Sequence, residues 1–428
     1  MIFACLFLNN LEENNVWNKL KKNIALGIFI AVLGAVVGAI VWFLLWLMNL
    51  GIDFFWTWLP GKFNIPVYNL VICGVGGLLV GLLQTKFGPC PSELSEDMAA
   101  IKQGKRLPYD NLPVIAVCAL VPLIFGGSLG PEAGLTGVIA GLCYWLADRF
   151  KYAYEEVEDL AQVGIAATLG VIFHAPLFGF VNQVEDEKGG QAIPKNSKIL
   201  LYFIAIFAGF GVYILLSGLF GGGMGLGRFG HIAIGRNELL AMLPLALVGA
   251  LCGILYFYFA KGVKVVTAPL EKHKVFLGII GGLVLGGVGM LLPFTMFAGE
   301  HQMGEMMEIW QTLPIWLLFL TGIVKLLMIN ICIGTGWRGG NIFPIIFSAV
   351  CIGYGFAALF PMVDATFCVA VVTAAVAGAI MRKPIAVVML LIICFPVDAI
   401  IPMCVGAIIA ASIPLPKRFR QMTDAQGE

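Results

Sequence analysis

The property that most constrains this chain is a series of apolar stretches, most of them about as long as a bilayer is thick. A helix that spans a bilayer needs about 20 mostly apolar residues. Stretches that approach or exceed this length occur at 24–48, 67–83, 112–125, 199–219, 239–260, 276–292 and 315–333. Charged residues make up only 12% of the chain, compared with about 25% in soluble proteins. The sequence therefore predicts an all-α integral membrane protein.

The remaining composition argues against several classes of partner and of chemistry. The formal net charge is +1, which gives no strong field to attract nucleic acid. The eleven cysteines form no Cys-x-x-Cys pair, and most stand singly in apolar runs, as small buried side chains do. The four histidines are scattered, and no nucleophile stands out beside a base. We expect no cofactor, no metal site and no enzymatic activity.

The chain also repeats itself. Three short segments of the first half are matched in the same order in the second half, at offsets of 205 to 213 residues. The matched pairs are 76–81 with 281–286, 126–131 with 339–344, and 173–177 with 381–385. One match between glycine-rich segments would mean little, but three at nearly constant offset indicate a duplicated unit of about 200 residues.

The duplication divides the chain into five parts. We expect an N-terminal segment at 1–23, a first membrane repeat at 24–219, a glycine-rich linker at 220–239, a second membrane repeat at 240–414 and a short tail at 415–428. Lysines precede the first apolar stretch, and basic residues follow the last one. By the positive-inside tendency, both termini are expected on the cytoplasmic side.

Two of the matched segments predict a binding site for an anion. Each is a glycine-rich run that reaches a proline, at Pro131 and at Pro344. Such a run leaves backbone N–H groups unpaired where a helix begins, and proline is tolerated in the first turn. In duplicated transporters, broken helices point their N-termini at a substrate near the bilayer midplane. Two such starts at one point would hold an anion without a cationic side chain. The alternative is that both runs are kinked packing turns.

These residues resemble the CLC superfamily of chloride channels and chloride/proton antiporters, over about residues 24–414. Two family motifs at helix starts are similar to Gly127-Ser128-Leu129-Gly130-Pro131 and to Gly340-Asn341-Ile342-Phe343-Pro344. A third signature is similar to the run from His174 to Gly179, and the family's anion-binding serine maps onto Ser92. The runs look most like a bacterial branch described as ion-transport or ion-channel proteins.

The resemblance implies an architecture and a set of partners. The fold would consist of many tilted and partly spanning helices in two inverted-topology repeats. Each subunit would bind a small inorganic anion such as chloride at Ser92 and at the two motifs. Two subunits would form a homodimer in the lipid bilayer of a bacterial inner membrane.

Departures from the family pattern concern the gate. The gating glutamate of the family falls at Leu129, which has no ionisable group, so an uncoupled, channel-like passage of the anion is expected. The alternative is anion/proton exchange, with Glu132 as a displaced gate or Asp186 at the position of the inner proton-relay acid. The other interpretation of Glu132 is an acid that complements the dipole of its own helix. The family's inner tyrosine is missing, because no tyrosine follows Tyr354. Passage of another anion, such as fluoride or nitrate, is a further alternative.

Three further positions carry polar groups of interest. His174 is expected to be a turn residue packed at a helix start. The acids and histidine between Glu300 and Glu308 are expected in an exposed, partly helical loop rather than in a metal site. Arg338 either raises the anion concentration at the mouth of the pore or extends to the bilayer interface.

Overall fold

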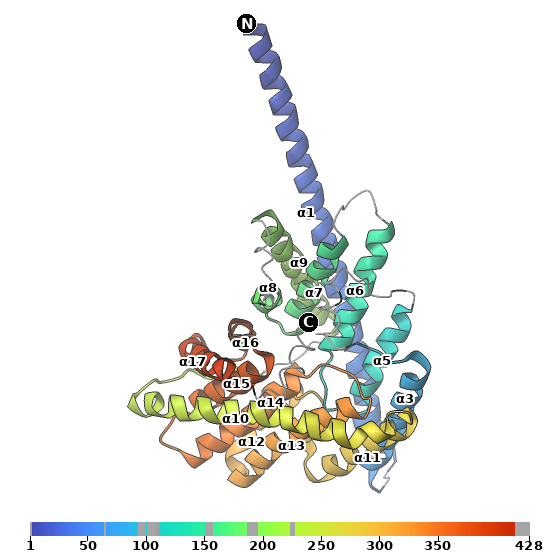
Figure 1. Ribbon diagram of the computed structural model, residues 1–428, viewed down its shortest axis with the longest axis vertical. Coiled ribbons are helices and arrows are strands. Elements are labelled where there is room, and N and C mark those ends of the chain that lie inside the picture. Colours follow the sequence, from blue (N-terminus) through green and yellow to red (C-terminus); the bar gives the residue numbers. More distant parts are fainter. Residues whose placement is uncertain are drawn as a thin grey trace.

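The computed structural model of the chain is built almost wholly of helices (Figure 1). The structure describes residues 2–63, 66–92, 100, 109, 111–149, 157–185, 196–222 and 227–415. Within these ranges there is no β-strand, and one isolated β-bridge joins two glycines, Gly130 and Gly340. The molecule is therefore an assembly of helices packed directly on one another.

The seven predicted apolar stretches all correspond to helices. They are α1 (Ile2–Asp53), α3 (Tyr68–Phe87), α5 (Leu112–Ile124), α9 (Asn196–Phe220), α10 (Arg236–Thr267), α11 (Lys274–Leu291) and α13 (Ile315–Gly334). In the described part of the chain, seven helices are long and apolar enough to cross a membrane. Six of them are in the list above, from which α5 is excluded, and the seventh is α14 (Ile342–Leu359). The prediction of an all-α membrane protein is confirmed.

Shorter helices fill the space between the long ones. They are α6 (Glu132–Arg149), α7 (Val157–Ile172), α8 (Pro176–Glu185), α12 (Glu300–Ile309), α15 (Ala365–Met381), α16 (Pro384–Leu391) and α17 (Ile400–Ser412). Single turns complete the chain: η1 (Phe54–Trp58), α2 (Leu59–Lys62), η2 (Ala268–Leu270), η3 (Pro293–Thr295), η4 (Trp310–Thr312) and η5 (Val397–Ala399). A helix of 8 residues, such as α16, is about 12 Å long and spans less than half of a bilayer core.

Glycines let the long helices approach one another closely. A Cβ atom on Gly77 of α3 would lie 2.2 Å from the carbonyl oxygen of Gly278 in α11. A Cβ atom on Gly282 of α11 would lie 2.1 Å from the carbonyl oxygen of Cys73 in α3. The first pair of matched segments is thus glycine-rich because its two helices pack backbone against backbone. In the same way, α1 runs beside α9, with Gly34 against the backbone of Ala205 (Figure 1).

The third pair of matched segments has the same backbone conformation in both halves. His174 and Arg382 occupy equivalent positions and have φ values of 53° and 58°, in the left-handed region. Each lies two residues before the proline that begins a short helix. This helix is α8 after His174 and α16 after Arg382. His174 packs edge-on against the rings of Phe210 and Tyr213, so its prediction as a packed turn residue is confirmed. The limits of the five parts of the chain stay a prediction.

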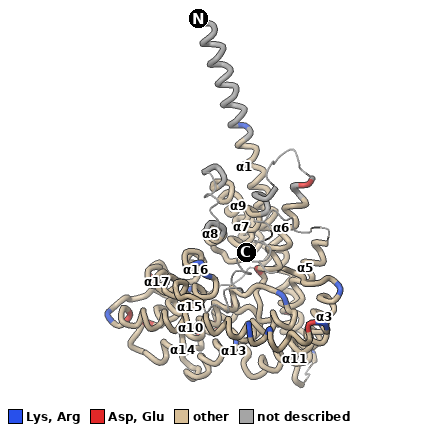
Figure 2. The backbone as a smooth tube through the Cα atoms, in the orientation of Figure 1, with Lys and Arg blue, Asp and Glu red and all other residues tan. Residues whose placement is uncertain are grey.

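Charged residues are sparse in the helical body (Figure 2). Among the described residues, four charged side chains are buried: Glu132, Glu238, Glu300 and Lys325. Glu238 has a structural explanation, because its carboxylate accepts from the backbone N–H groups of Gly235 and Asp364 at 2.9 and 3.0 Å and caps α10. The other three buried charges belong to the region where α6 and α14 begin.

Candidate functional site

The two glycine-rich runs meet in the structure. The backbone N–H of Gly130 donates to the carbonyl of Gly340, and the N–H of Gly340 donates to the carbonyl of Gly130, both at 2.7 Å. This reciprocal pair joins the segment before α6 to the segment before α14. The structure therefore brings the two predicted helix starts to one point, although they are about 210 residues apart in the sequence.

The carboxylate of Glu132 occupies this meeting point. Glu132 is the first residue of α6, and its side chain is 1% exposed. Its Oε1 accepts from the backbone N–H of Ile342, the first residue of α14, at 2.7 Å. Its Oε2 is buried and has no hydrogen-bond partner among the described residues. Glu132 thus lies in the first turn of its own helix, as one interpretation held, and also contacts the start of a helix from the other half.

The two bridge glycines create the room for this carboxylate. A Cβ atom on Gly340 would lie 1.9 Å from Cδ of Glu132, and one on Gly130 would lie 2.0 Å from its Oε2. Distances this short cannot exist between non-bonded atoms. Any side chain at either position would therefore displace the Glu132 carboxylate, which explains why both runs have glycine there.

Ser128 and Leu129 are fully buried beside the bridge. The hydroxyl of Ser128 has no hydrogen-bond partner in the part of the chain that the structure describes. Buried polar groups normally have a partner, because leaving one unpaired costs about 1–3 kcal/mol. Leu129 packs close to Gly339, where an added Cβ would lie 2.9 Å from the Cβ of Leu129. The position predicted for a gating acid therefore contributes only apolar surface.

At the start of α14 the backbone, rather than the side chains, supplies the polar groups. The side chain of Asn341 binds a residue of another helix: its Nδ2 donates to the hydroxyl of Tyr256 on α10 at 3.1 Å. Phe343 stacks on Phe173, with 4.6 Å between the ring centroids. Pro344 is buried in the first turn. Among the predicted anion-binding residues of this run, Ile342 thus supplies a hydrogen-bond donor, its backbone N–H.

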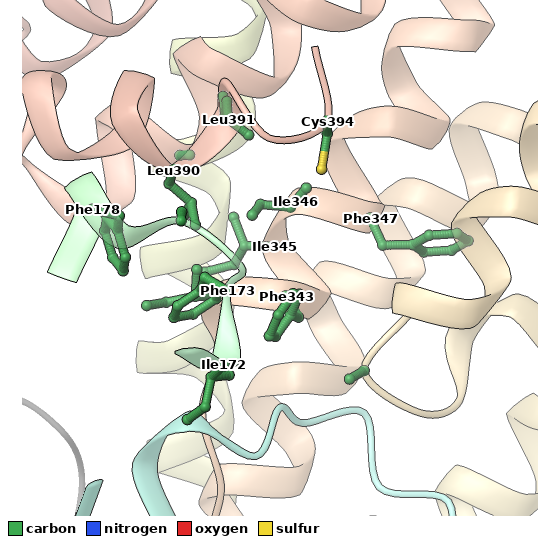
Figure 3. Close-up of a cluster of buried hydrophobic side chains, with 14 of the residues drawn as sticks. Ile172, Phe173, Phe178, Phe343, Ile345, Ile346, Phe347, Leu390, Leu391 and Cys394 are labelled. Atoms are coloured by element: carbon green, nitrogen blue, oxygen red, sulfur yellow. The ribbon is translucent and has the colours of Figure 1, made fainter. Parts of the chain in front are cut away.

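An apolar cluster lies around the first turns of α14 (Figure 3). Figure 3 shows Phe173 and Phe343 facing each other, with Ile345 and Ile346 of α14 and with Leu390 and Leu391 of α16 close behind them. Phe173 belongs to the turn between α7 and α8, whereas Leu390 and Leu391 belong to α16, so both halves of the chain contribute to this cluster.

Ser92 lies on a loop that is tied to both helix starts. Nη1 of Arg338, two residues before Gly340, lies 3.5 Å from the carbonyl oxygen of the neighbouring Pro91. A Cβ atom on Gly134 of α6 would lie 3.7 Å from the ring of Pro91. Ser92 itself is half-buried. Its role in anion binding stays a prediction, as do the roles of the other residues named above, and Asp186 lies outside the described residues.

Two residues of this region were wrongly placed or overlooked by sequence reasoning. Glu300 was expected in an exposed loop, but it is 4% exposed at the start of α12, whereas Glu305 and Glu308 on the same helix are exposed. Lys325 was not singled out, although a lone cation in an apolar stretch is a signal of a buried functional or paired group. No group of three acids, histidines or cysteines in the described ranges is arranged to hold a metal ion.

The chain is similar to known ion-transport proteins. The family model described as voltage gated chloride channel matches residues 76–414. The "Putative ion-transport protein YfeO" of Escherichia coli O7:K1 (strain IAI39) is 26% identical over 315 residues, which cover 70% of this chain and 71% of that protein. The protein of the same name from Shigella sonnei (strain Ss046) is also 26% identical over 315 residues, with the same shares.

Solved structures show the same fold. A CLC-type fluoride/proton antiporter superposes with a TM-score of 0.73 at 19% identity, covering 91% of this chain and 95% of that one. A slow cyanobacterial Cl⁻/H⁺ antiporter gives 0.75 at 18% identity, covering 92% and 97%. The predicted resemblance and the predicted fold class, with two inverted-topology repeats of tilted helices, are confirmed. Homodimer formation, the bacterial inner membrane as location and the cytoplasmic position of both termini stay predictions.

Proposed function

This chain belongs to the voltage gated chloride channel family, and on this premise we propose that it passes a small monovalent anion such as chloride across the membrane. The anion would bind where α6 and α14 begin. Each helix start carries a partial charge of about +0.5, so two of them balance roughly one negative charge. This balance favours a monovalent over a multivalent anion, since no cationic side chain is needed.

The observation that carries the proposal is the hydrogen bond from the Ile342 N–H to Glu132 at 2.7 Å. A carboxylate is itself an anion, and a buried one is costly unless it receives donors and a favourable field. Its presence at this point supports the idea that the start of α14 stabilises negative charge. The unpaired hydroxyl of Ser128 supplies a further donor beside it.

We propose that Glu132, rather than a residue at position 129, is the gate. When ionised, Glu132 holds the Ile342 N–H and competes with the permeating anion for it. When Glu132 takes up a proton, its negative charge is lost, the hydrogen bond weakens, and an anion takes the donor. Anion flux therefore rises as the pH falls. A gate at Glu132 favours anion/proton exchange, with this carboxylate in place of the missing one, over the uncoupled passage inferred from Leu129.

The test measures chloride efflux from liposomes that contain the purified protein, while the internal pH is followed in the same vesicles. Chloride flux that rises as the pH falls, with opposing proton movement, is expected. Chloride flux independent of pH and without proton movement would support the uncoupled route past Leu129 and overturn the role of Glu132. Silence with chloride, fluoride and nitrate would overturn the transport function itself.

Glu132→Gln is expected to abolish the pH dependence of the flux. Glutamine has nearly the same shape but never carries a negative charge, so the variant resembles the protonated gate at every pH. Flux at high pH should rise to the level that the unmodified protein reaches at low pH. Glu305→Gln, an exposed acid on α12, is the control and should keep the original pH profile. A Glu132→Gln variant with an unchanged profile would show that another group is the gate.

A further inference from the structure

Lys325 is a buried cation that the mechanism above does not use. It lies near the middle of α13 and is 0% exposed. Its Nζ donates to the carbonyls of Phe294, Met296 and Phe297 at 3.1, 2.9 and 2.9 Å. An ammonium has three N–H donors, one for each of these acceptors, whereas a neutral amine has two, so the arrangement calls for protonated Lys325. A buried charge within a membrane helix is a candidate functional group.

The three carbonyls belong to a turn, 294–297, that contains a residue in an unfavourable conformation. Phe297 has a φ of 57°, in the left-handed region that bulky side chains rarely adopt. Its backbone is held on both sides, because its carbonyl accepts from Lys325 and its N–H donates to the carbonyl of Gly126 at 3.1 Å. Such a conformation persists only where the surroundings impose it, and residues of this kind cluster at functional sites.

The contact with Gly126 connects this turn to the first glycine-rich run. Gly126 follows α5 and opens the run that reaches Gly130. A Cβ atom on Gly126 would lie 2.8 Å from Cε of Met296 and 2.8 Å from the ring of Trp56. Trp56 in turn packs edge-on against Phe297, with 5.1 Å between the ring centroids. The turn, which belongs to the second half of the chain, therefore covers and holds the first residue of the run.

The first run is thus held by the second half at both of its ends. Phe297 holds Gly126, and the reciprocal bridge with Gly340 holds Gly130. Ser128 stands midway between these two anchors, and its buried hydroxyl has no hydrogen-bond partner among the described residues. A shift of either anchor would therefore move this hydroxyl and the start of α6.

The same cation also contacts α14. Nζ of Lys325 lies 4.9 Å from the ring centroid of Phe347, which is a cation–π contact. A Cβ atom on Gly299 would lie 2.6 Å from the Cβ of Phe347, so the chain that follows the turn packs on α14 as well. Phe347 is five residues beyond Ile342, which is about 7.5 Å along the helix axis. Lys325 thus joins the turn to the elements that carry both helix starts.

We propose that Lys325 is a positioning residue of the anion site, an inference that rests on the proposed function. It acts through the turn 294–297, which fixes Gly126 and so orients the Ser128 hydroxyl and the backbone N–H groups at the start of α6. Without the ammonium, the three carbonyls lose their shared donor and Phe297 is free to leave its left-handed conformation. The anion site then keeps its residues but loses their arrangement.

The experiment compares how flux depends on chloride concentration in Lys325→Met, in Lys325→Arg and in the unmodified protein, with the liposome assay described above. Lys325→Met should raise the apparent KM for chloride by about tenfold, which corresponds to the loss of one hydrogen bond to the anion. Lys325→Arg keeps the charge and N–H donors and should restore most of the original KM. An unchanged KM in Lys325→Met would overturn the inference.

A purely structural role of Lys325 would have a different signature. It would lower the amount of folded protein, and with it the maximal flux, but would not change the KM of the protein that remains folded. Glu238→Ala, which removes the cap of α10, is the control for such a loss of stability and should leave the KM unchanged. If Lys325→Met does not fold, Lys325→Gln, which supplies two N–H donors, takes its place.

Hydrogen exchange of the purified protein in detergent tests the positioning without transport. The segments 126–131 and 293–299 should both exchange faster in Lys325→Met than in Glu238→Ala, and at the original rate in Lys325→Arg. Faster exchange confined to 293–299 would overturn the inference, because the turn would then not hold the first run. Faster exchange of both segments in a protein that conducts no anion would leave the positioning standing and overturn the proposed function.

Discussion

Replacing Gly340 by alanine is expected to make the anion flux independent of pH and to destabilise the protein. An added Cβ would lie 1.9, 2.2 and 2.3 Å from Cδ, Oε1 and Cγ of Glu132, the three nearest atoms. The carboxylate therefore has to leave the Ile342 N–H, and the flux at high pH should rise as in Glu132→Gln. Overpacking of a filled interior costs about 1–3 kcal/mol. The liposome flux assay and thermal unfolding in detergent measure the two effects.

A double-mutant cycle tests the cause of this effect. In a Glu132→Ala background the side chain that meets the new methyl group is absent, so Gly340→Ala should have little further effect on stability. Gly304→Ala is the control, because a Cβ atom there meets nothing within 4 Å. If Gly340→Ala keeps the original pH profile, the carboxylate does not act from the start of α14. If it is equally destabilising without Glu132, the clash lies elsewhere.

Lys325→Met is expected to destabilise the protein more than any other single change considered above. Methionine fills a similar volume but donates no hydrogen bond, so the carbonyls of Phe294, Met296 and Phe297 lose their shared donor. A buried polar group that is left without a hydrogen-bond partner typically costs about 1–3 kcal/mol. The melting temperature in detergent should fall markedly.

Lys274→Met provides the comparison for Lys325→Met. Lys274 is exposed, and its Nζ donates to one carbonyl, that of Gln84, at 3.1 Å. Exposed substitutions usually change stability by no more than about 0.5 kcal/mol. Equal melting temperatures for the two variants would show that the Lys325 ammonium contributes nothing to stability. The three hydrogen bonds at Lys325 would then be replaceable by apolar packing.

The long helices and the meeting of the two runs could be predicted because their signals are local. The length of each apolar stretch determines that it forms a helix in a membrane. The glycines of 76–81 and 281–286 mark helices that pack at backbone distance, and their repetition indicates the duplication. The prolines at 131 and 344 mark the first turns of two helices. Each of these inferences uses only a short segment of the sequence and the matching segment in the other half.

The partners of the buried charges could not be predicted, because they depend on contacts between distant segments. The acceptor of the Ile342 N–H is Glu132, 210 residues earlier in the chain. Glu300 looked exposed because α12 is polar on most of its surface. Its buried face consists of Glu300, Met303 and Met306, spaced three residues apart, and only the packing against α14 distinguishes this acid from Glu305.

The reciprocal bridge between Gly130 and Gly340 has a genetic consequence. Glu132, the acid proposed as the gate, is encoded in the first repeat, and the Ile342 N–H that it accepts from is encoded in the second. Neither half of the chain, expressed alone, contains both the carboxylate and the N–H that donates to it. A defect introduced at 127–132 should therefore be suppressed by second-site changes that cluster at 339–343, and the two repeats are constrained to evolve as partners rather than as copies.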